Sequence, residues 1–576
     1  MGRSLPIPSL SWRRGLLSTV AALALVVSAV LLLSEQPAAH GRRLASIFED
    51  DALLVDQPLT PGGNAVVAHT LATLKSLGAT RVRVLVIWRG VAPDPTARAS
   101  PHGFNPADPA DYGTGWSVYD RIDVAAVAAG LKVYFDLTGP APRWATTAQP
   151  PGTNALAAKD AGGFLPSAAA FRAFVTAAGR RYDGHDSPPG AAGHPLPRVS
   201  FWSVWNEPNQ PGWLAPQQNP VTGHPLAPAV YRSLVDAFWA GMAASGHTPA
   251  SDTLLVGELA PEGCVTGVPC AFAPLGPGYA ATPPLPFLDD LYCATPVGAG
   301  QYQPLSGAAA RAAGCPANPV ASRFVAAHPG LFAATGFAEH PYSFSLPPNV
   351  PFAAPADSGF VPLASLPKLT SALDGIFNAY GVNRRPPLYL TEYGYVTNPP
   401  NPDYHVTPAQ QALYLDEATY MAAQNPRVAA LAQFELEDSN PAVVCGCRPG
   451  SRGYWQNFES GLEFLGGRPK PAFAAYRLPI FLPQLEAPTR PAPPGGLTTV
   501  WGMLRPAPTR RTETAQIQFA TAPHGPFRTI ATAETRDDSG IVTASVRLPG
   551  SGAVRIAWTP PGGPPIDSRA VAVTVR

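Results

Sequence analysis

The chain has 576 residues, of which 46% are hydrophobic and 14% charged, and its formal net charge is +1. This balance excludes a disordered protein, and the length exceeds what one core of ordinary size fills, so two domains are expected. Because no long basic run accompanies the near-zero charge, the sequence indicates no nucleic-acid partner.

The N-terminal segment has the pattern of an export signal. Arg3, Arg13 and Arg14 precede an uncharged apolar run at 15–33, and small residues follow it. A run of about 20 apolar residues also suffices to span a bilayer. We therefore predict a signal peptide or a transmembrane anchor within 1–41, with membrane contact through 15–33 if it is not cleaved. Either alternative predicts an extracellular or cell-surface protein.

Beyond residue 41, strand-like apolar runs alternate with helix-like segments. The eight runs lie at 44–49, 81–88, 131–137, 198–205, 253–259, 335–340, 387–392 and 428–436. The helical segments lie near 65–77, 118–130, 167–182, 229–245, 317–328, 366–380, 407–424 and 471–477. Eight such pairs predict an α/β protein with a (β/α)8 TIM barrel over 42–482. An open doubly wound sheet is the alternative, but the glycine-rich phosphate turn common in such sheets is missing.

The alternation stops at a proline-rich stretch, 483–496, which is typical of a semi-rigid linker. Residues 497–576 then show short strand-like segments separated by turn signals. This pattern predicts a small antiparallel β-sandwich domain. Such a domain either covers the barrel or binds a glycan, and the sequence leaves both roles open.

Six cysteines fit an oxidising compartment. Their order suggests three local disulfides, namely Cys264 with Cys270, Cys293 with Cys315, and Cys445 with Cys447. The spacings do not resemble a zinc framework, and HExxH, P-loop, GxGxxG and GxSxG motifs are all missing. We therefore expect neither a metal nor a cofactor.

Two glutamates stand at predicted strand ends. WNEP, 205–208, ends the fourth strand, and TEYG, 391–394, ends the seventh. Functional side chains of (β/α)8 barrels lie at these ends. Glycoside hydrolysis needs two carboxyl groups at one bond, one to protonate the leaving oxygen and one to attack the anomeric carbon. Apolar neighbours such as Trp202 and Trp205 would raise the pKa of the acid by desolvation.

These motifs resemble the retaining glycoside hydrolases of the large (β/α)8 clan. In that clan the acid/base glutamate follows an asparagine on strand four and the nucleophile ends strand seven. The resemblance thus implies Glu207 as acid/base and Glu392 as nucleophile. It extends from residue 44 to about 480, through GATRVRV at 78–84, GLKVYFDLTGPAPRWA at 130–145, HPY at 340–342 and SGLEFLGGRPKPAFAAYR at 460–477. FWSVWNEPN is most similar to families 39 and 5 and their unclassified bacterial relatives.

The resemblance also implies supporting residues. Arg83 would keep the nucleophile ionised, Asn206 would hold a sugar hydroxyl, and His340 and Tyr342 would hydrogen-bond the nucleophile. One departure concerns strand eight, which ends in AQFELED where many members carry a sugar-stacking tryptophan.

Aromatic and acidic residues elsewhere supply further candidates. Sugar-platform candidates, each of which can instead be core packing, are Trp88, Trp144, Trp205 and Trp213. Rival carboxylates near strand ends are Glu258, Glu262 and Glu435.

The sequence therefore predicts an exported or membrane-anchored glycoside hydrolase that cleaves O-glycosidic bonds with retention. The reaction would pass through a covalent glycosyl-enzyme on an oligosaccharide, polysaccharide or glycoside. Because a barrel supports many chemistries, this prediction depends on the site. The alternatives are a catalytically weak glycan-binding barrel, a transglycosylase, and a surface scaffold that acts through the β-sandwich.

Overall fold

The structure is a computed structural model. It describes residues 43–56, 63–148, 163–188, 193–265, 278–353, 355, 358–444, 448, 451, 454–455, 457–487, 489–505 and 511–576. The predicted signal or anchor at 15–33 lies outside these residues. Within them, no helix combines the length and the apolar character needed to cross a membrane.

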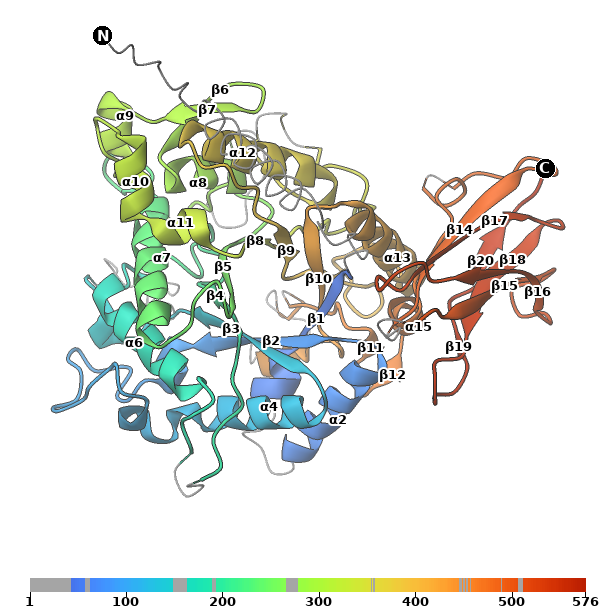
Figure 1. Cartoon of the computed structure of the whole chain (residues 1–576), viewed down its shortest axis with the longest axis horizontal. Helices are drawn as coiled ribbons and strands as arrows, with labels where there is room; N and C mark the ends of the chain where they lie inside the picture. Colours follow the sequence, from blue (N-terminus) through green and yellow to red (C-terminus); the bar gives the residue numbers. More distant parts are fainter. Residues whose placement is uncertain are drawn as a thin grey trace, which may run out of the picture.

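Eight parallel strands close into a barrel at the centre of the larger body (Figure 1). Around the barrel they follow the order β1-β10-β9-β8-β5-β4-β3-β2. They are β1 (Ala45–Glu49), β2 (Arg81–Ile87), β3 (Lys132–Thr138), β4 (Phe201–Val204), β5 (Thr253–Leu259), β8 (Gly336–Glu339), β9 (Leu388–Leu390) and β10 (Val428–Phe434). Each coincides with a predicted run to within a few residues, so the predicted TIM barrel is confirmed and the open sheet is excluded.

Helices surround the barrel (Figure 1). The predicted ones are α2 (Gly63–Ser76), α4 (Ser117–Ala128), α6 (Ala168–Arg181), α7 (Ala227–Ala244), α10 (Ala321–Ala327), α12 (Leu366–Ala379), α13 (Pro408–Gln424) and α15 (Pro471–Arg477). Shorter ones are α3 (Trp88–Val91), α8 (Pro284–Leu291), α9 (Gly307–Ala312), α11 (Pro329–Ala333) and α14 (Pro441–Val444). Helix α13 begins where predicted because Thr407 and Gln410 form a reciprocal capping box at its N-terminus.

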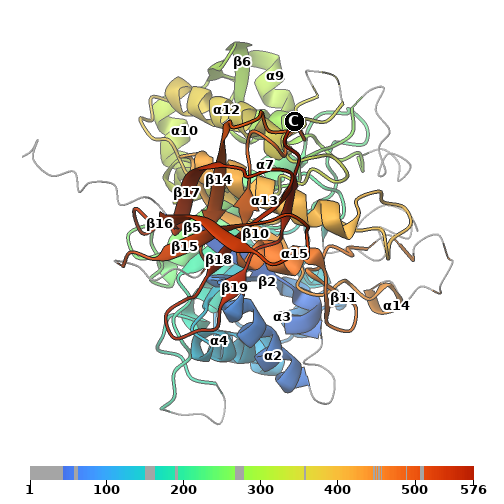
Figure 2. The same ribbon diagram turned by 90° about the vertical axis from the view of Figure 1, so that its right-hand side faces the viewer.

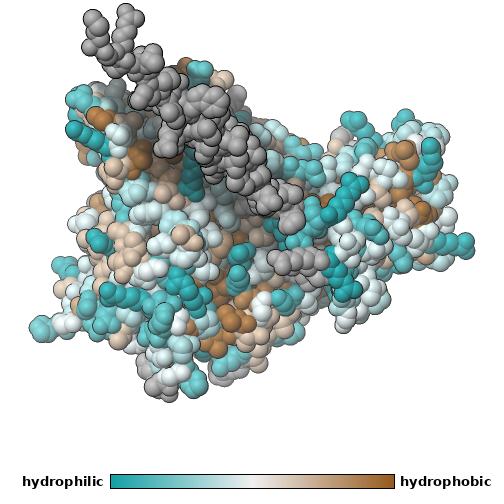
Figure 3. All heavy atoms as spheres, in the orientation of Figure 1, coloured by the Kyte–Doolittle hydropathy of each residue, from teal (hydrophilic) through white to brown (hydrophobic). Residues whose placement is uncertain are grey.

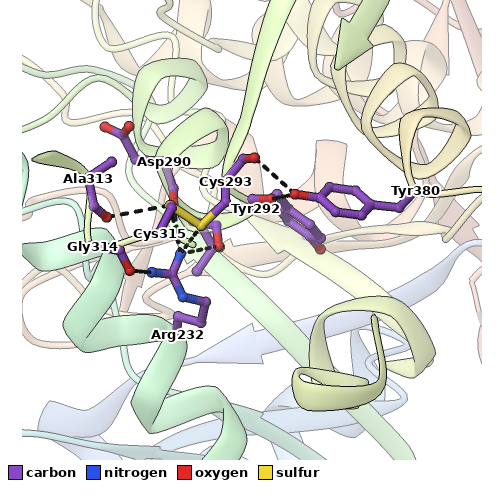
Figure 4. Close-up of a disulfide and its surroundings, with 9 residues drawn as sticks. Arg232, Asp290, Tyr292, Cys293, Ala313, Gly314, Cys315 and Tyr380 are labelled. Carbon is purple, nitrogen blue, oxygen red and sulfur yellow. Dashed lines mark hydrogen bonds between the residues drawn. A yellow bond between two sulfur atoms is a disulfide. The ribbon is translucent and has the colours of Figure 1, made fainter. Parts of the chain in front are cut away.

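The connection between β5 and β8 is a long excursion. It contains α8, α9 and an antiparallel hairpin of β6 (Ala294–Gly298) and β7 (Gln301–Pro304). The Cys293–Cys315 disulfide closes it, which confirms that predicted pair (Figure 4). Arg232 of α7 donates to the carbonyl oxygens of Asp290 and Gly314 beside the bridge. Cys264 is also disulfide-bonded, whereas Cys270, Cys445 and Cys447 lie outside the described residues.

Two antiparallel sheets form the C-terminal region (Figures 1 and 2). One has the order β13-β14-β17, and the other has the order β16-β15-β18, with β19 and β20 both paired to β18. The strands are β13 (Ile480–Phe481), β14 (Leu497–Met503), β15 (Thr514–Ala520), β16 (Arg528–Glu534), β17 (Ile541–Arg547), β18 (Gly552–Trp558), β19 (Ile566–Asp567) and β20 (Val571–Val573). Buried side chains of both sheets form one core, as in a sandwich. Strand β13 precedes the predicted linker.

The C-terminal sheets pack directly on α13 and α15 of the barrel. Arg569 donates to Asp416 of α13 and, over 2.7 Å, to Glu486. Trp501 of β14 lies edge-on to Tyr420 of α13, with ring centroids 5.3 Å apart, and belongs to the core of the barrel. The two regions therefore share part of one hydrophobic core.

The outer surface carries little continuous apolar area on the face shown in Figure 3, where hydrophobic residues form small separate patches. A short hairpin of β11 (Glu463–Phe464) and β12 (Arg468–Pro469) precedes α15. Small, separate patches of apolar residues on the surface are ordinary for a folded protein.

Candidate active site

Two layers of side chains fill the barrel interior. The first is apolar and consists of Ile47, Tyr134, Phe201, Leu255, Ala338, Ala430 and Ala432. Side chains alternate along a strand, so the residue two positions further on faces the same interior. Toward the carboxyl ends this rule brings in Glu49 after Ile47, Asp136 after Tyr134, Ser203 after Phe201, and His340 after Ala338. A buried polar layer thus lies directly above the apolar one.

Arg83 of β2 lies at the centre of this polar layer and is fully buried. One terminal nitrogen donates to Glu392 over 2.7 Å and also to Glu49. The other donates to Asn206 (2.7 Å), Asp136 (2.9 Å) and Glu258 (3.1 Å). Because the guanidinium is planar with donors in a fixed fork, it holds all these groups in one arrangement. Three of the predicted site residues, Arg83, Asn206 and Glu392, therefore meet in space.

The carboxyl groups around Arg83 differ in their tendency to hold a proton. Burial raises the pKa of Glu49 well above its usual value and that of Asp136 to about 7, although Arg83 opposes both shifts. Burial also acts on Glu258, but Arg83 and His340 outweigh it and hold the pKa of Glu258 well below its usual value. The environment thus keeps Glu258 ionised beside neighbours that bind protons more readily.

A backbone irregularity turns Glu258 toward this layer. Gly257 has φ +115° and Glu258 has φ +52°, and the pairing register between β5 and β8 shifts there. A Cβ on Gly257 would lie 2.4 Å from the carbonyl oxygen of Ala338, so only glycine fits. Glu258 then accepts hydrogen bonds from Thr391 (2.7 Å) and Tyr134 in addition to Arg83.

His340 connects the two sides of the site. Its Nε2 lies 2.8 Å from Glu258 Oε2, and its Nδ1 lies 3.1 Å from Glu207 Oε1 and 3.5 Å from Glu392 Oε2. Burial opposes the charge on the ring, but the surrounding carboxylates raise the pKa of His340 well above its usual value. As an imidazolium, it donates from both nitrogens at once. Tyr342 donates its hydroxyl to Glu392 over 3.1 Å.

Glu207 and Glu392 face each other across the mouth. Carboxylate oxygens of the two residues lie within 4.8 Å of each other. Their side chains are 21% and 9% exposed, whereas Glu49 and Glu258 are closed off from solvent. Burial raises the pKa of Glu207, and the hydrogen bond and charge of His340 partly oppose this rise. Glu207 therefore retains a proton more readily than a free glutamic acid does.

The backbone at the end of β4 is strained where it presents Glu207. Trp205 has φ +63° and Glu207 has φ +41°, a region that side-chain-bearing residues rarely adopt. The Glu207 amide donates to the carbonyl oxygen of Glu258 over 2.9 Å, which fixes the turn. Such strain occurs preferentially at functional sites.

Among the described residues, one group of three has the spacing to hold a metal ion, namely Glu207, His340 and Glu392. Cationic side chains of the protein already engage the atoms of this group. Arg83 already donates to one oxygen of Glu392, and the imidazolium form of His340 has no free lone pair. This group is better suited to proton transfer than to metal binding.

The tryptophan candidates fare differently. Trp88 and Trp205 are fully buried, with Trp88 stacked on Phe174 and Trp205 packed edge-on against Phe171. These two offer no free face to a sugar, which corrects the prediction for them, because core packing takes both rings. Trp144 and Trp213 are partly exposed and stay candidates.

Among the rival carboxylates, Glu262 is exposed and Glu435 is buried and bonded to Ser439. Glu258 lies within the site but is sealed beneath it. Sequence reasoning missed Glu49 and Asp136 as site residues. Their signal was present, since each is the one acid in a mainly apolar predicted strand, LASIFE or LKVYFDL.

No family model matches the sequence, and no curated protein matches it. Solved structures with a similar fold include a family 39 glycoside hydrolase from Bacteroides cellulosilyticus WH2, at 14% identity over 88% of this chain and 80% of that chain, with a TM-score of 0.43. Others are a glucosidase from Croceicoccus marinus (13%, 89% and 95%, TM-score 0.42) and a family 51 α-L-arabinofuranosidase from Bifidobacterium longum (12%, 88% and 94%, TM-score 0.42). The strand order of this chain is itself that of a closed (β/α)8 barrel.

Proposed function

We propose that this protein is a retaining glycoside hydrolase with Glu392 as nucleophile and Glu207 as acid/base. The observation that carries the proposal is the approach of these two carboxyl groups, within 4.8 Å, from opposite strand ends of one barrel mouth. Retaining enzymes hold their carboxyl pair about 5–5.5 Å apart, while inverting enzymes need about 6.5–9.5 Å to admit a water molecule.

The surroundings of the two groups suit different roles. Arg83 and Tyr342 both donate to Glu392, which stabilises the carboxylate and aims it at the anomeric carbon. Glu207 has a pKa raised by burial and lies at the solvent-facing edge of the pair. In the first step Glu392 forms a bond to the anomeric carbon while Glu207 gives its proton to the leaving oxygen. In the second step Glu207 takes a proton from the water that cleaves the glycosyl-enzyme.

Asn206 is placed to bind the substrate. Its side-chain oxygen accepts from Arg83 over 2.7 Å, so the amide orientation is fixed with its nitrogen as the remaining donor. We propose that this amide donates to a sugar hydroxyl next to the anomeric carbon, a contact that strengthens as charge develops in the transition state.

We further propose that the protein acts outside the cytoplasm, as a secreted or membrane-anchored enzyme. The Cys293–Cys315 disulfide supports this proposal, because such bonds persist in oxidising compartments. Fractionating cells that express the full chain would test it, and exclusive recovery in the cytoplasm would contradict it.

The function can be tested with a panel of aryl glycosides and polysaccharides on the wild type, Glu207→Ala and Glu392→Ala. Loss of Glu207 should lower kcat/KM only mildly for a 2,4-dinitrophenyl glycoside, whose leaving group needs no proton, and severely for a poor leaving group. Loss of the nucleophile should be severe for both. Glu262→Ala, an exposed glutamate beyond β5, is the matched control. Equal hydrolysis by all four proteins would refute the proposal.

Retention is tested separately by following the first-formed product by NMR. The anomeric configuration of the substrate should be kept, and inversion would refute the assignment of Glu392 as nucleophile. Transfer to an added sugar in place of water would instead identify a transglycosylase.

A further inference from the structure

A row of aromatic rings begins beside the proposed nucleophile. Tyr342, whose hydroxyl donates to Glu392, lies nearly parallel to Phe344, with ring centroids 6.2 Å apart and 12° between the planes. Phe344 is in turn nearly parallel to Phe352, at 5.6 Å and 20°. The loop after β8 thus carries ring after ring away from the two carboxyl groups.

Two further rings contact this group through Tyr342 and Phe458. Phe458 lies 6.3 Å from Tyr342 and 5.0 Å from Phe434, the last residue of β10, between ring centroids. We refer to these five residues, Phe434, Phe458, Tyr342, Phe344 and Phe352, as the aromatic row. It joins the loops that follow the sixth and eighth strands of the barrel.

Part of the aromatic row is open to solvent. Phe458 is 44% exposed and is the one aromatic among the exposed large hydrophobic side chains of the described residues. Phe344 and Phe352 are half-buried. A single exposed apolar residue is ordinary, but here it continues a line of rings that starts at a buried catalytic candidate.

The backbone holds Phe344 in an unfavourable conformation. Its φ of +51° lies in the left-handed region, which is rare for a bulky residue and unfavourable. The loop around it is fixed, since Tyr395 donates to the carbonyl oxygen of Leu346 over 3.0 Å. Such strain persists at ligand-binding positions because the surrounding structure enforces it.

Beyond Phe352 the surface is hollowed. A pocket of about 220 Å³ lies between Phe352, Phe360 and three prolines, Pro351, Pro355 and Pro362. Rigid proline and aromatic walls keep such a pocket open without a ligand. The aromatic row therefore ends at a recess whose walls also include Ser358, Ser365 and Lys368.

We propose that the aromatic row binds further sugar residues of an oligo- or polysaccharide whose scissile bond lies between Glu207 and Glu392. This inference rests on the proposed function and deepens it by naming the substrate class. Aromatic rings pack against the C–H faces of sugars, and the three rings of the row with open surface, Phe458, Phe344 and Phe352, suit a chain of sugars rather than a single glycoside. Because no member of the row is charged, it suits uncharged sugar units.

The test compares long and short substrates in Phe458→Ala. The probes are cello-, xylo- and mannohexaose together with the 4-nitrophenyl β-glycosides of the same sugars. For the preferred sugar, the ratio of kcat/KM on the hexasaccharide to kcat/KM on the aryl glycoside should fall about tenfold or more. Phe458→Trp keeps a ring and should largely restore the ratio, whereas Phe458→Leu should not.

Val350→Ala is the matched control, since Val350 is an exposed apolar residue on the same loop as Phe344 but carries no ring. It should leave the ratio unchanged. Thermal unfolding of each variant checks the fold, and Phe458 is exposed enough that its loss opens no internal cavity.

The possible failures are distinguishable. If the wild type hydrolyses the probes and Phe458→Ala leaves the ratio unchanged, the aromatic row is not a substrate surface and the proposed function stands. If no probe is hydrolysed, the proposed function fails for these sugars. Calorimetry then measures whether the aromatic row binds the same hexasaccharides. Equal affinity of the wild type and Phe458→Ala for the hexasaccharides, or no affinity in either, would overturn the proposal that the aromatic row binds sugars.

Discussion

Arg83 in the barrel mouth and Arg569 at the contact with the C-terminal sheets are both largely buried arginines held by carboxylates, yet their surroundings differ. Arg569 donates to two acids, Asp416 and Glu486, which join two packed surfaces. Arg83 is fully enclosed and donates to four acids and one amide. A buried arginine that joins two packed surfaces, such as Arg569, stabilises the fold. That role does not explain why Arg83 contacts acids from several strands.

We interpret the acids around Arg83 as a cluster that controls which carboxyl groups of the site hold a proton. One guanidinium balances one negative charge, so the acids around Arg83 exceed what it can neutralise. Burial raises the pKa of Glu49 and brings that of Asp136 to about 7, so a proton on Asp136 takes up part of the excess near neutral pH. Buried acidic clusters are expensive for stability, and their presence at the carboxyl ends of barrel strands favours a functional role.

The largest difference between the two regions should appear on removing one acid from each. Glu392→Ala should lower kcat/KM about 10⁴-fold or more, because no other group replaces the proposed nucleophile. Glu486→Ala, at the second arginine, should leave kcat/KM of the folded protein within about twofold and reduce the free energy of unfolding by about 2 kcal/mol. Steady-state kinetics and chemical denaturation measure both. A comparable activity loss in the two variants would remove the distinction.

Substitutions in the hydrophobic core shared by the barrel and the C-terminal sheets should reduce stability and leave activity intact, the opposite of Glu392→Ala. Trp501→Ala deletes a ring that packs on Tyr420 and should reduce the free energy of unfolding by about 3–5 kcal/mol. The chemistry of the folded fraction should stay close to wild type. Deleting residues 497–576 removes this ring and its neighbours together, so we expect a strongly destabilised barrel. Full thermal stability of the truncated chain would show that the sheets are an independent module.

The smallest expected effect is a pH shift from Glu258→Gln. The Glu258 carboxylate supports the charge on His340, and that charge lowers the pKa of Glu207 against the effect of burial. Weakening the imidazolium should therefore raise the pKa of Glu207. Because the acid must be protonated to act, the alkaline limb of kcat/KM should move to higher pH, by about 0.5–1 unit. An unmoved limb would leave Glu258 with a structural role alone.

The barrel was predictable because its strands are continuous apolar runs and its helices follow at regular spacing. Arg83, Asn206, Glu207 and Glu392 were predictable because each stands at a polar break in such a run. The inward turn of Glu258 was not, since it depends on a bulge at a single glycine. Sequence alone also treats every tryptophan near a strand end alike, whereas burial separates Trp88 and Trp205 from Trp213.

The aromatic row illustrates a different limit. Its members come from the loop after β8 and from the end of β10 with the loop that follows, more than eighty residues further on, and neither segment alone predicts that their rings align. The HPY motif predicts Tyr342 as a site residue, whereas only the three-dimensional structure shows that Phe344 and Phe458 lie beside it. Loops depend on tertiary contacts in a way that buried strands do not.

Gly257 carries a consequence for anyone who would redesign this barrel. A methyl group at that position would press on the Ala338 carbonyl of β8, and His340, which directly follows this strand, would have to move with it. Libraries that vary the mouth for new substrates can sample the loops freely, but they should keep this glycine constant. A single alanine there would displace the residues that such a library is meant to preserve.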